Sequence, residues 1–99
     1  MDRGEAERYL ADARDENCFW CNDGQIVKNV TGLLPAVKKM KNQTFAYHVN
    51  KEKNDFATWI RDIIGDAELA ERLGKKKDKA STIKLVNDRV KSLQKALSD

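Results

Sequence analysis

The clearest structural signal in the chain is the stretch NDFATWIRDIIG, residues 54–65. Its large apolar side chains recur at the i, i+3, i+4, i+7 spacing of one helix face. They are Phe56, Trp59, Ile60 and Ile63. Asn54 and Asp55 precede them, where a side-chain oxygen caps the N–H groups that a helix start leaves unpaired. Gly65 follows, as expected at a helix end. The stretch therefore predicts a capped helix with one buried face.

Helical spacing continues on both sides of this stretch. The further helices are expected at residues 2–16 (a thin stripe, loosely held), about 32–40, 45–49, 66–73 and 81–98. Their expected caps are Asn29 or Thr31, Thr44, Asp66 and Ser81. Pro35 is comfortable only in a first helical turn, so the helix that contains it is expected to begin near residues 32–34.

Two short β-prone runs, residues 18–21 and 25–27, flank an Asp-Gly turn and predict a hairpin. An isolated ribbon is marginally stable, so the hairpin is expected to pack on helices. The aromatic residues Phe19, Trp20, Phe45, Phe56 and Trp59 are expected in the core.

The expected fold class is mainly α: one domain over residues 1–99, with five or six short helices and one small β-hairpin on a single core. Within it lie an N-terminal helix (1–16), a central part (19–73) and an amphipathic C-terminal helix (81–98).

The net charge of +3 hides an alternation of acidic and basic blocks. Residues 1–24 carry seven acidic and three basic groups, and residues 25–53 carry one and six. Residues 54–73 carry five and two, and residues 74–99 carry three and eight. Adjacent blocks either neutralise one another, which we favour, or leave a positive patch on the folded surface.

No apolar run approaches the roughly 18 residues of a membrane span, and the acidic N-terminus is unlike a signal peptide. Two cysteines in a chain rich in Lys, Glu and Asp indicate a reducing compartment. We therefore expect a cytoplasmic protein without membrane contact.

Cys18-x-x-Cys21 is the only arrangement with the spacing of a metal or redox site. Two such thiolates clamp zinc or cycle as a redox pair. Zinc needs four ligands, however, and His48, the only histidine, brings the count to three. The pair also falls in an expected strand, whereas redox pairs begin helices. We interpret both cysteines as buried free thiols, and expect no metal and no cofactor.

His48, Asn50, Asn54 and Asp55 form the other polar group of interest. A lone histidine serves as a general base when a nucleophile and an orienting partner are near, and neither is visible in the local sequence. A hydrogen-bonded structural role for His48 is favoured, with recognition of a partner by the four residues as the alternative. No phosphate-binding loop, nucleophile elbow or zinc-protease pattern occurs, so we expect no enzyme.

The lysine-rich loop and the C-terminal helix offer an alternative function. The loop lysines are Lys75, Lys76, Lys77 and Lys79, and the helix adds Lys84, Arg89, Lys91 and Lys95. Together they predict weak, sequence-independent binding of nucleic acid, unless they are only a solvated surface.

The C-terminal helix also carries a 3, 4, 3, 4 apolar spacing at Ile83, Val86, Val90, Leu93 and Leu97. That spacing fits packing within the domain, which we favour, or a homodimeric coiled coil.

Three segments together resemble a family of small domains found mainly in archaea and small-genome bacteria. They are Phe19-Trp20-Cys21-Asn22-Asp23-Gly24, Thr44-Phe45-Ala46-Tyr47-His48-Val49-Asn50 and Lys53-Asn54-Asp55-Phe56-Ala57-Thr58-Trp59-Ile60-Arg61-Asp62. The family pattern has an aromatic pair before an Asn-Asp-Gly-like turn, then Phe-x-x-His-x-Asn, then Asn-Asp-Phe-x-x-Trp. The resemblance covers residues 19–73.

The resemblance implies no activity, because none is assigned to that family. Its members sometimes occur attached to other domains, which implies an accessory or adaptor role. Position 21 is more often aliphatic in the family, which argues against a family-wide metal or redox role for the cysteines. The sequence thus predicts a non-enzymatic protein-interaction or adaptor module, with the nucleic-acid binder as the alternative.

Overall fold

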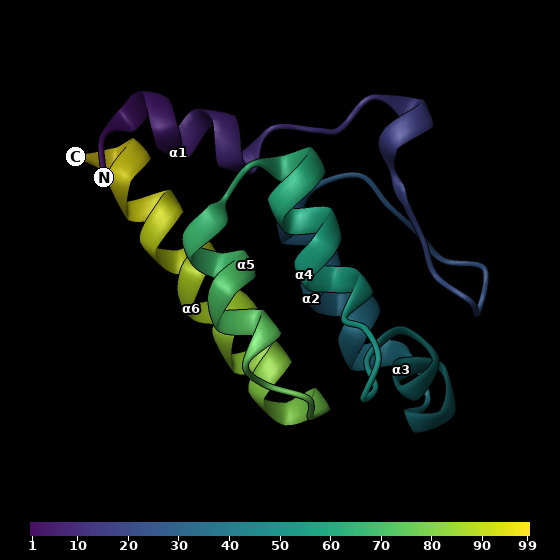
Figure 1. Ribbon diagram of the computed structural model, residues 1–99. Helices are drawn as coiled ribbons and strands as arrows, with labels where there is room; N and C mark the ends of the chain where they lie inside the picture. The colour runs from purple at the N-terminus through teal and green to yellow at the C-terminus, as the bar shows by residue number, and fades with distance from the viewer.

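One long helix, α6, runs along a side of the molecule, and the remaining helices pack on it or on one another (Figure 1). This is seen in a computed structural model that describes residues 1–99. The elements are α1 (Arg3–Leu10), a 3-10 turn (Asp15–Asn17), β1 (Phe19–Trp20), β2 (Ile26–Val27), α2 (Val30–Lys39), α3 (Asn42–His48), α4 (Asp55–Trp59), a π-helical turn (Ile60–Ile64), α5 (Ala67–Gly74) and α6 (Lys79–Ser98). The expected fold class is confirmed. None of these helices has the length and apolar character that crossing a membrane requires.

α6 is the element that holds the domain together, since it contacts α1, α2 and α5. Its predicted apolar stripe is buried or partly buried in these contacts, at Ile83, Val86, Val90, Leu93 and Leu97. The stripe is therefore used inside the domain. α6 begins two residues before Ser81, which was expected to cap it. The cap is Asp78, whose carboxylate accepts the Ser81 N–H at 2.8 Å.

α4 continues into a π-helical turn, and this turn shifts the apolar stripe by one residue. The Gly65 N–H donates to the Ile60 carbonyl five residues back, at 2.7 Å. The extra residue in the turn brings Ile64 to the core, 9% exposed, and leaves Ile63 38% exposed. The prediction that Ile63 is buried is wrong, because it assumed an unbroken α-helical period. The predicted cap at Asn54 and the end at Gly65, where φ is 89°, are confirmed.

α2 begins at Val30, so the later start predicted from Pro35 is wrong. Pro35 lies inside the helix, where the missing N–H and the clash of its ring with the preceding turn cost about 3 kcal/mol or more. Two contacts offset that cost: Val30 is buried, and Asn29 caps the helix by accepting the Gly32 N–H at 2.7 Å. Similarly, α3 begins two residues before Thr44, which is therefore not its cap.

α1 ends at Leu10 rather than near Glu16. Beyond it the chain is extended, and the Ala13 N–H donates to the Lys28 carbonyl at 2.6 Å. This contact ties the segment after α1 to the segment after β2. The helix itself is seated on α6 through Ala6, which is fully buried.

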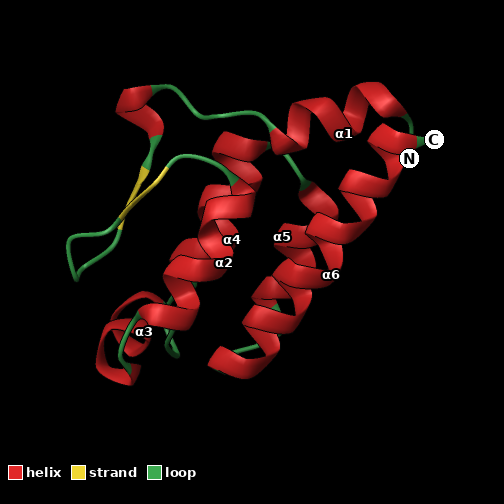
Figure 2. Ribbon diagram, turned by 180° about the vertical axis from the view of Figure 1, so that it is seen from behind, coloured by secondary structure: helices red, strands yellow, loops and turns green.

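The predicted hairpin is present, on the side of the molecule away from α6 (Figure 2). Its register places Phe19 opposite Val27 and Trp20 opposite Ile26. Gly24 turns the chain with φ of 94°, a value that glycine adopts without strain. The expected burial is confirmed for the aromatic residues other than Trp20, namely Phe19, Phe45, Phe56 and Trp59. For Trp20 it is wrong: successive strand residues face opposite sides, and Phe19 and Cys21 occupy the inner one.

Candidate functional site

His48, at the end of α3, is buried between the hairpin and α4 and uses both ring nitrogens. Its Nε2 accepts the backbone N–H of Asn22 at 2.9 Å, and its Nδ1 lies 3.0 Å from Oδ2 of Asp55. Because Nε2 accepts, a neutral ring carries its proton on Nδ1 and donates it to the carboxylate. Only 3% of His48 is exposed. Neither nitrogen is therefore free to take a proton from a substrate.

An aromatic cluster surrounds the imidazole of His48. The Phe19 ring lies 5.1 Å from it edge-on, and the Phe56 ring lies 5.4 Å away. Phe19 also stacks on Phe56 at 5.0 Å and meets Trp59 edge-on at 5.8 Å. Such pairs contribute roughly 0.5–1.5 kcal/mol each beyond the area they bury. The cluster fixes the inner face of the hairpin against α3 and α4.

Asn54 and Asp55 start α4 and join it to its neighbours. The Asn54 side chain accepts the Ala57 N–H at 3.0 Å and donates to the Leu73 carbonyl, also at 3.0 Å. This one side chain thus both caps α4 and holds the end of α5. The Asp55 carboxylate accepts a hydrogen bond from Lys53 Nζ at 3.0 Å, in addition to its bond with His48. Both residues are engaged in holding the fold.

Asn50 closes the loop between α3 and α4. Its amide donates to the Ala46 carbonyl at 3.1 Å, and its side-chain oxygen accepts the Glu52 N–H at 3.0 Å. The fold thus brings the four predicted polar site residues into one region. Every one of them is occupied by hydrogen bonds within the chain, so the group has the character of a structural network.

The two cysteines are free thiols in different environments. Cys21 is 5% exposed, and burial, with a smaller contribution from the nearby Asp23 carboxylate, raises its pKa to about 11. Cys18 is half-buried, and its thiol lies 3.6 Å from the Arg14 carbonyl. The expected burial is therefore found for Cys21 and only partly for Cys18. No group of three or more His, Cys, Asp or Glu side chains lies close enough together to hold a metal ion.

The lysine-rich loop between α5 and α6 lies beside the end of α2. Lys79 donates through Nζ to the Met40 carbonyl, and Lys75 pairs with Glu71 at 3.4 Å. Lys76 and Lys77 are exposed and form no ion pair. The basic residues of α6 are placed elsewhere: Lys84 pairs with Asp88 within its own helix, and Arg89, Lys91 and Lys95 lie further toward the C-terminus.

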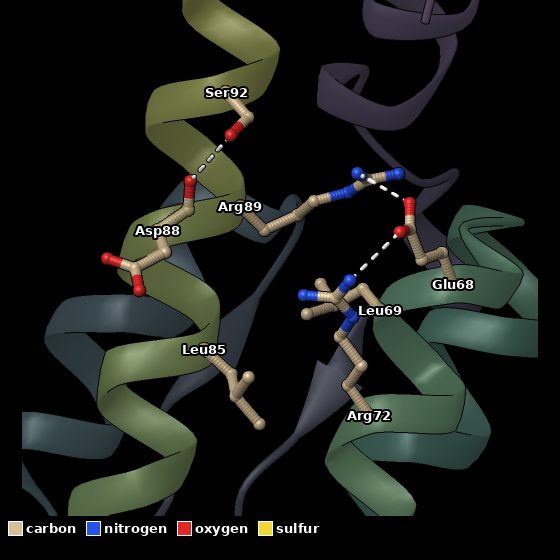
Figure 3. A pocket seen from close by; sticks show the side chains of 7 residues that line it. All are labelled: Glu68, Leu69, Arg72, Leu85, Asp88, Arg89 and Ser92. Atoms are coloured by element: carbon tan, nitrogen blue, oxygen red, sulfur yellow. Dashed lines mark hydrogen bonds and ion pairs between the residues drawn. The ribbon is translucent and has the colours of Figure 1, made fainter.

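A groove of about 230 Å³ separates α5 from α6 (Figure 3). Its lining residues are Glu68, Leu69, Arg72, Leu85, Asp88, Arg89 and Ser92. Arg89 binds the buried Asp66 through two hydrogen bonds, 2.7 and 2.9 Å, which raise the pKa of its guanidinium. It also reaches Glu68 at 2.9 Å, and Arg72 binds the other oxygen of Glu68 at 3.2 Å. These charges neutralise one another, so the groove offers no unpaired group to a charged ligand.

The outer face of the hairpin is the most exposed apolar surface in the structure. Trp20 is 68% exposed and Ile26 is 55% exposed. The two residues are cross-strand partners, so their side chains lie next to each other on one face. Sequence reasoning missed this pair because it assigned the tryptophan to the core, although the alternation of Phe19, Trp20 and Cys21 already indicated an outward position.

Comparisons with family models, curated proteins and solved structures find no match to this chain.

Proposed function

We propose that the protein is a non-enzymatic protein-interaction module that contacts its partner through the outer face of the hairpin. One observation carries this proposal: Trp20 and Ile26, a large aromatic and a large aliphatic side chain, are paired on a surface that nothing in the chain covers. Tryptophan is among the residues most enriched at the energetic centres of protein interfaces. Adjacent exposed apolar side chains of this size are typical of contact sites.

Contacts on the inner side of the hairpin hold its outer face in place, and this supports the proposal. On the opposite side of the same strand Phe19 stacks on Phe56, and the Asn22 N–H is held by His48. The hairpin is therefore fixed before a partner arrives. A preorganised anchor loses less conformational entropy on binding than a mobile one.

The charges around the hairpin indicate the chemistry of the partner. Near the hairpin the chain carries four acidic groups, at Asp12, Asp15, Glu16 and Asp23, and two basic groups, at Arg14 and Lys28. Lys28 pairs with Asp12 at 3.8 Å, so the acidic excess comes from the other three carboxylates. A complementary partner offers an apolar pocket for Trp20 with Lys or Arg side chains around its rim. Because the apolar pair is small, we expect a transient complex of modest interface area.

The absence of an enzymatic role is part of the same proposal. His48 has both ring nitrogens engaged, and the raised pKa of Cys21 keeps its thiol protonated near neutral pH. We further propose a cytoplasmic location, because both thiols are free. The family that the sequence resembles includes members attached to other domains, which suits a docking module.

The test uses the full chain as bait in extract of the native host, followed by purified binding of the protein recovered. Trp20→Ala and Ile26→Ala are the test variants, and Ile63→Ala is the matched control, since Ile63 is an exposed isoleucine outside the hairpin. Loss of a central tryptophan is expected to weaken binding by roughly 30-fold or more, with the melting temperature unchanged.

The control is expected to bind as the wild type does, and binding is expected to weaken as salt screens the acidic rim. Equal affinity of Trp20→Ala and wild type for a purified partner would show that the hairpin is not the contact surface.

A further inference from the structure

We propose that one end of the molecule is a binding surface for the phosphate backbone of nucleic acid, separate from the hairpin face. We call this surface the basic end. Six exposed lysines define it: Lys38, Lys39, Lys41, Lys51, Lys76 and Lys77. They come from three segments far apart in the sequence: the end of α2 with its connection to α3, the α3–α4 loop and the α5–α6 loop.

Two long-range contacts bring these segments together. Lys79, the first residue of α6, donates to the Met40 carbonyl where α2 ends, which joins the α5–α6 loop to the α2–α3 connection. Asn54 donates to the Leu73 carbonyl, which joins the α3–α4 loop to the end of α5. In Figure 1 these connections lie at the bottom of the view, opposite the two chain termini. The fold therefore gathers lysines that the sequence separates by up to 39 positions.

The lysines of the basic end are free to bind an anion. None of the six forms an ion pair. Elsewhere the cations are mostly neutralised: Lys28 pairs with Asp12, Lys84 with Asp88, and Arg89 with two carboxylates. Most acidic residues of the first block lie on α1 or in the segment after it, away from this end. Asp23 is the exception, since it lies in the hairpin turn beside Asn22, which binds His48 at the end of α3. Residues 38–41, 50–54 and 75–79 also hold the carboxylates Glu52 and Asp78, but they contain nine lysines, so the modest total of +3 conceals a local excess.

The side-chain chemistry favours a phosphate backbone over other polyanions. Lysines spread over three segments match a line of phosphates better than a single phosphate group. A membrane surface needs apolar side chains beside the cations, and the exposed Trp20 and Ile26 lie on the hairpin instead. Tyr47 is the one exposed aromatic residue near this end, and Lys53 Nζ sits 4.5 Å from its ring centroid. Base stacking is therefore minor, and the binding is independent of sequence.

The experiment measures the binding of the full chain to a short fluorescein-labelled DNA duplex by anisotropy, over about 50 to 200 mM salt. The triple variant Lys39→Gln, Lys76→Gln, Lys77→Gln is compared with Lys28→Gln, Lys91→Gln, Lys95→Gln. Each removes three positive charges from the same net charge of +3, but the control lysines lie outside the basic end. Circular dichroism checks that both variants are folded.

The wild type is expected to bind with an affinity that falls steeply with salt. The basic-end variant is expected to bind at least about tenfold more weakly and to lose roughly 2–3 from the slope of log K against log salt, about 0.9 for each phosphate contact. The control is expected to keep most of the slope. Equal losses in both variants, no binding at low salt, or tighter binding to phosphatidylserine vesicles than to duplex would overturn the proposal. These outcomes are distinct from a failure of the hairpin proposal, because Trp20 and Ile26 are unchanged in both variants and DNA binding is measured without the protein partner.

Discussion

The buried imidazole of His48 joins three parts of the chain, because its two nitrogens are bound to the hairpin loop and to the start of α4. The Asp55 carboxylate holds the ring in the tautomer that leaves Nε2 free to accept the Asn22 N–H. Asp55 is therefore a positioning residue for the fold, and its loss leaves a buried N–H donor unpaired.

We predict that Asp55→Ala lowers the free energy of unfolding by about 1–2 kcal/mol, or several degrees in melting temperature. Asp55→Asn is expected to lose less, since its amide oxygen still accepts the His48 proton. Asp62→Ala is the control, because Asp62 is exposed and pairs only with its neighbour Arg61. Thermal unfolding by circular dichroism measures all three. A stability loss as large for Asp62→Ala as for Asp55→Ala would contradict this assignment.

The two thiols are predicted to differ in reactivity. With a pKa of about 11, Cys21 is only about 0.1% thiolate at pH 8, and it is buried as well. Iodoacetamide at pH 8 is therefore expected to label Cys18 first and Cys21 only slowly, with Cys21 labelling faster as pH rises and its thiolate fraction grows. Mass spectrometry of the native protein and of Cys18→Ser measures both sites. Fast labelling of native Cys18→Ser, matching the rate in denaturant, would mean that Cys21 is not protected.

At the scale of single elements, the π-helical turn changes which side chains form the core. An α-helical period places Ile63 with Phe56 and Ile60, whereas the extra residue in the turn buries Ile64 instead. The same helix thus carries a matched pair of isoleucines, one buried and one exposed.

Ile64→Ala is accordingly expected to cost about 2–4 kcal/mol, because it leaves a cavity in the core. Ile63→Ala is expected to stay within about 1 kcal/mol, since that side chain already meets solvent. Urea unfolding of the two variants compares them directly. If Ile63→Ala proved the more damaging change, the turn would be α-helical and the sequence-based stripe correct.

Elements set by local chemistry were predictable from the sequence. The cap at Asn54, the end at Gly65 and the Asp-Gly hairpin each depend on a few adjacent residues, and all are present. Features set by tertiary contacts were not predictable. Val30 is buried in the core, which holds Pro35 inside α2 against its own preference.

The polar contacts divide in the same way. Asp66 was expected as a cap and does accept the Leu69 N–H, but its bond to Arg89 spans 23 positions. The only signal for this bond in the sequence is the position of Arg89. It lies three residues after Val86 and three before Ser92, beside the apolar stripe of α6. The gathering of lysines at the basic end also depends on a distant contact, from Lys79 to Met40.

For the whole molecule, α6 is expected to decide both stability and assembly state. It contacts α1, α2 and α5, so the side chains that would pair with a second copy are already covered within one chain. Coiled-coil pairing would expose the core of the monomer. The chain is therefore expected to remain monomeric.

A monomeric chain and a stripe of α6 that the fold requires can both be measured. Light scattering at high micromolar concentration is expected to give the mass of one chain, 11.3 kDa. Val90→Asp buries an unpaired carboxylate among apolar side chains, at a cost of several kcal/mol in a domain whose total stability is of order 5–10 kcal/mol. That variant is expected to be largely unfolded by circular dichroism, whereas Lys91→Asp, one position away and exposed, is expected to fold. A wild-type dimer that Val90→Asp converts into a folded monomer would show that the stripe of α6 pairs two chains and is not required by either alone.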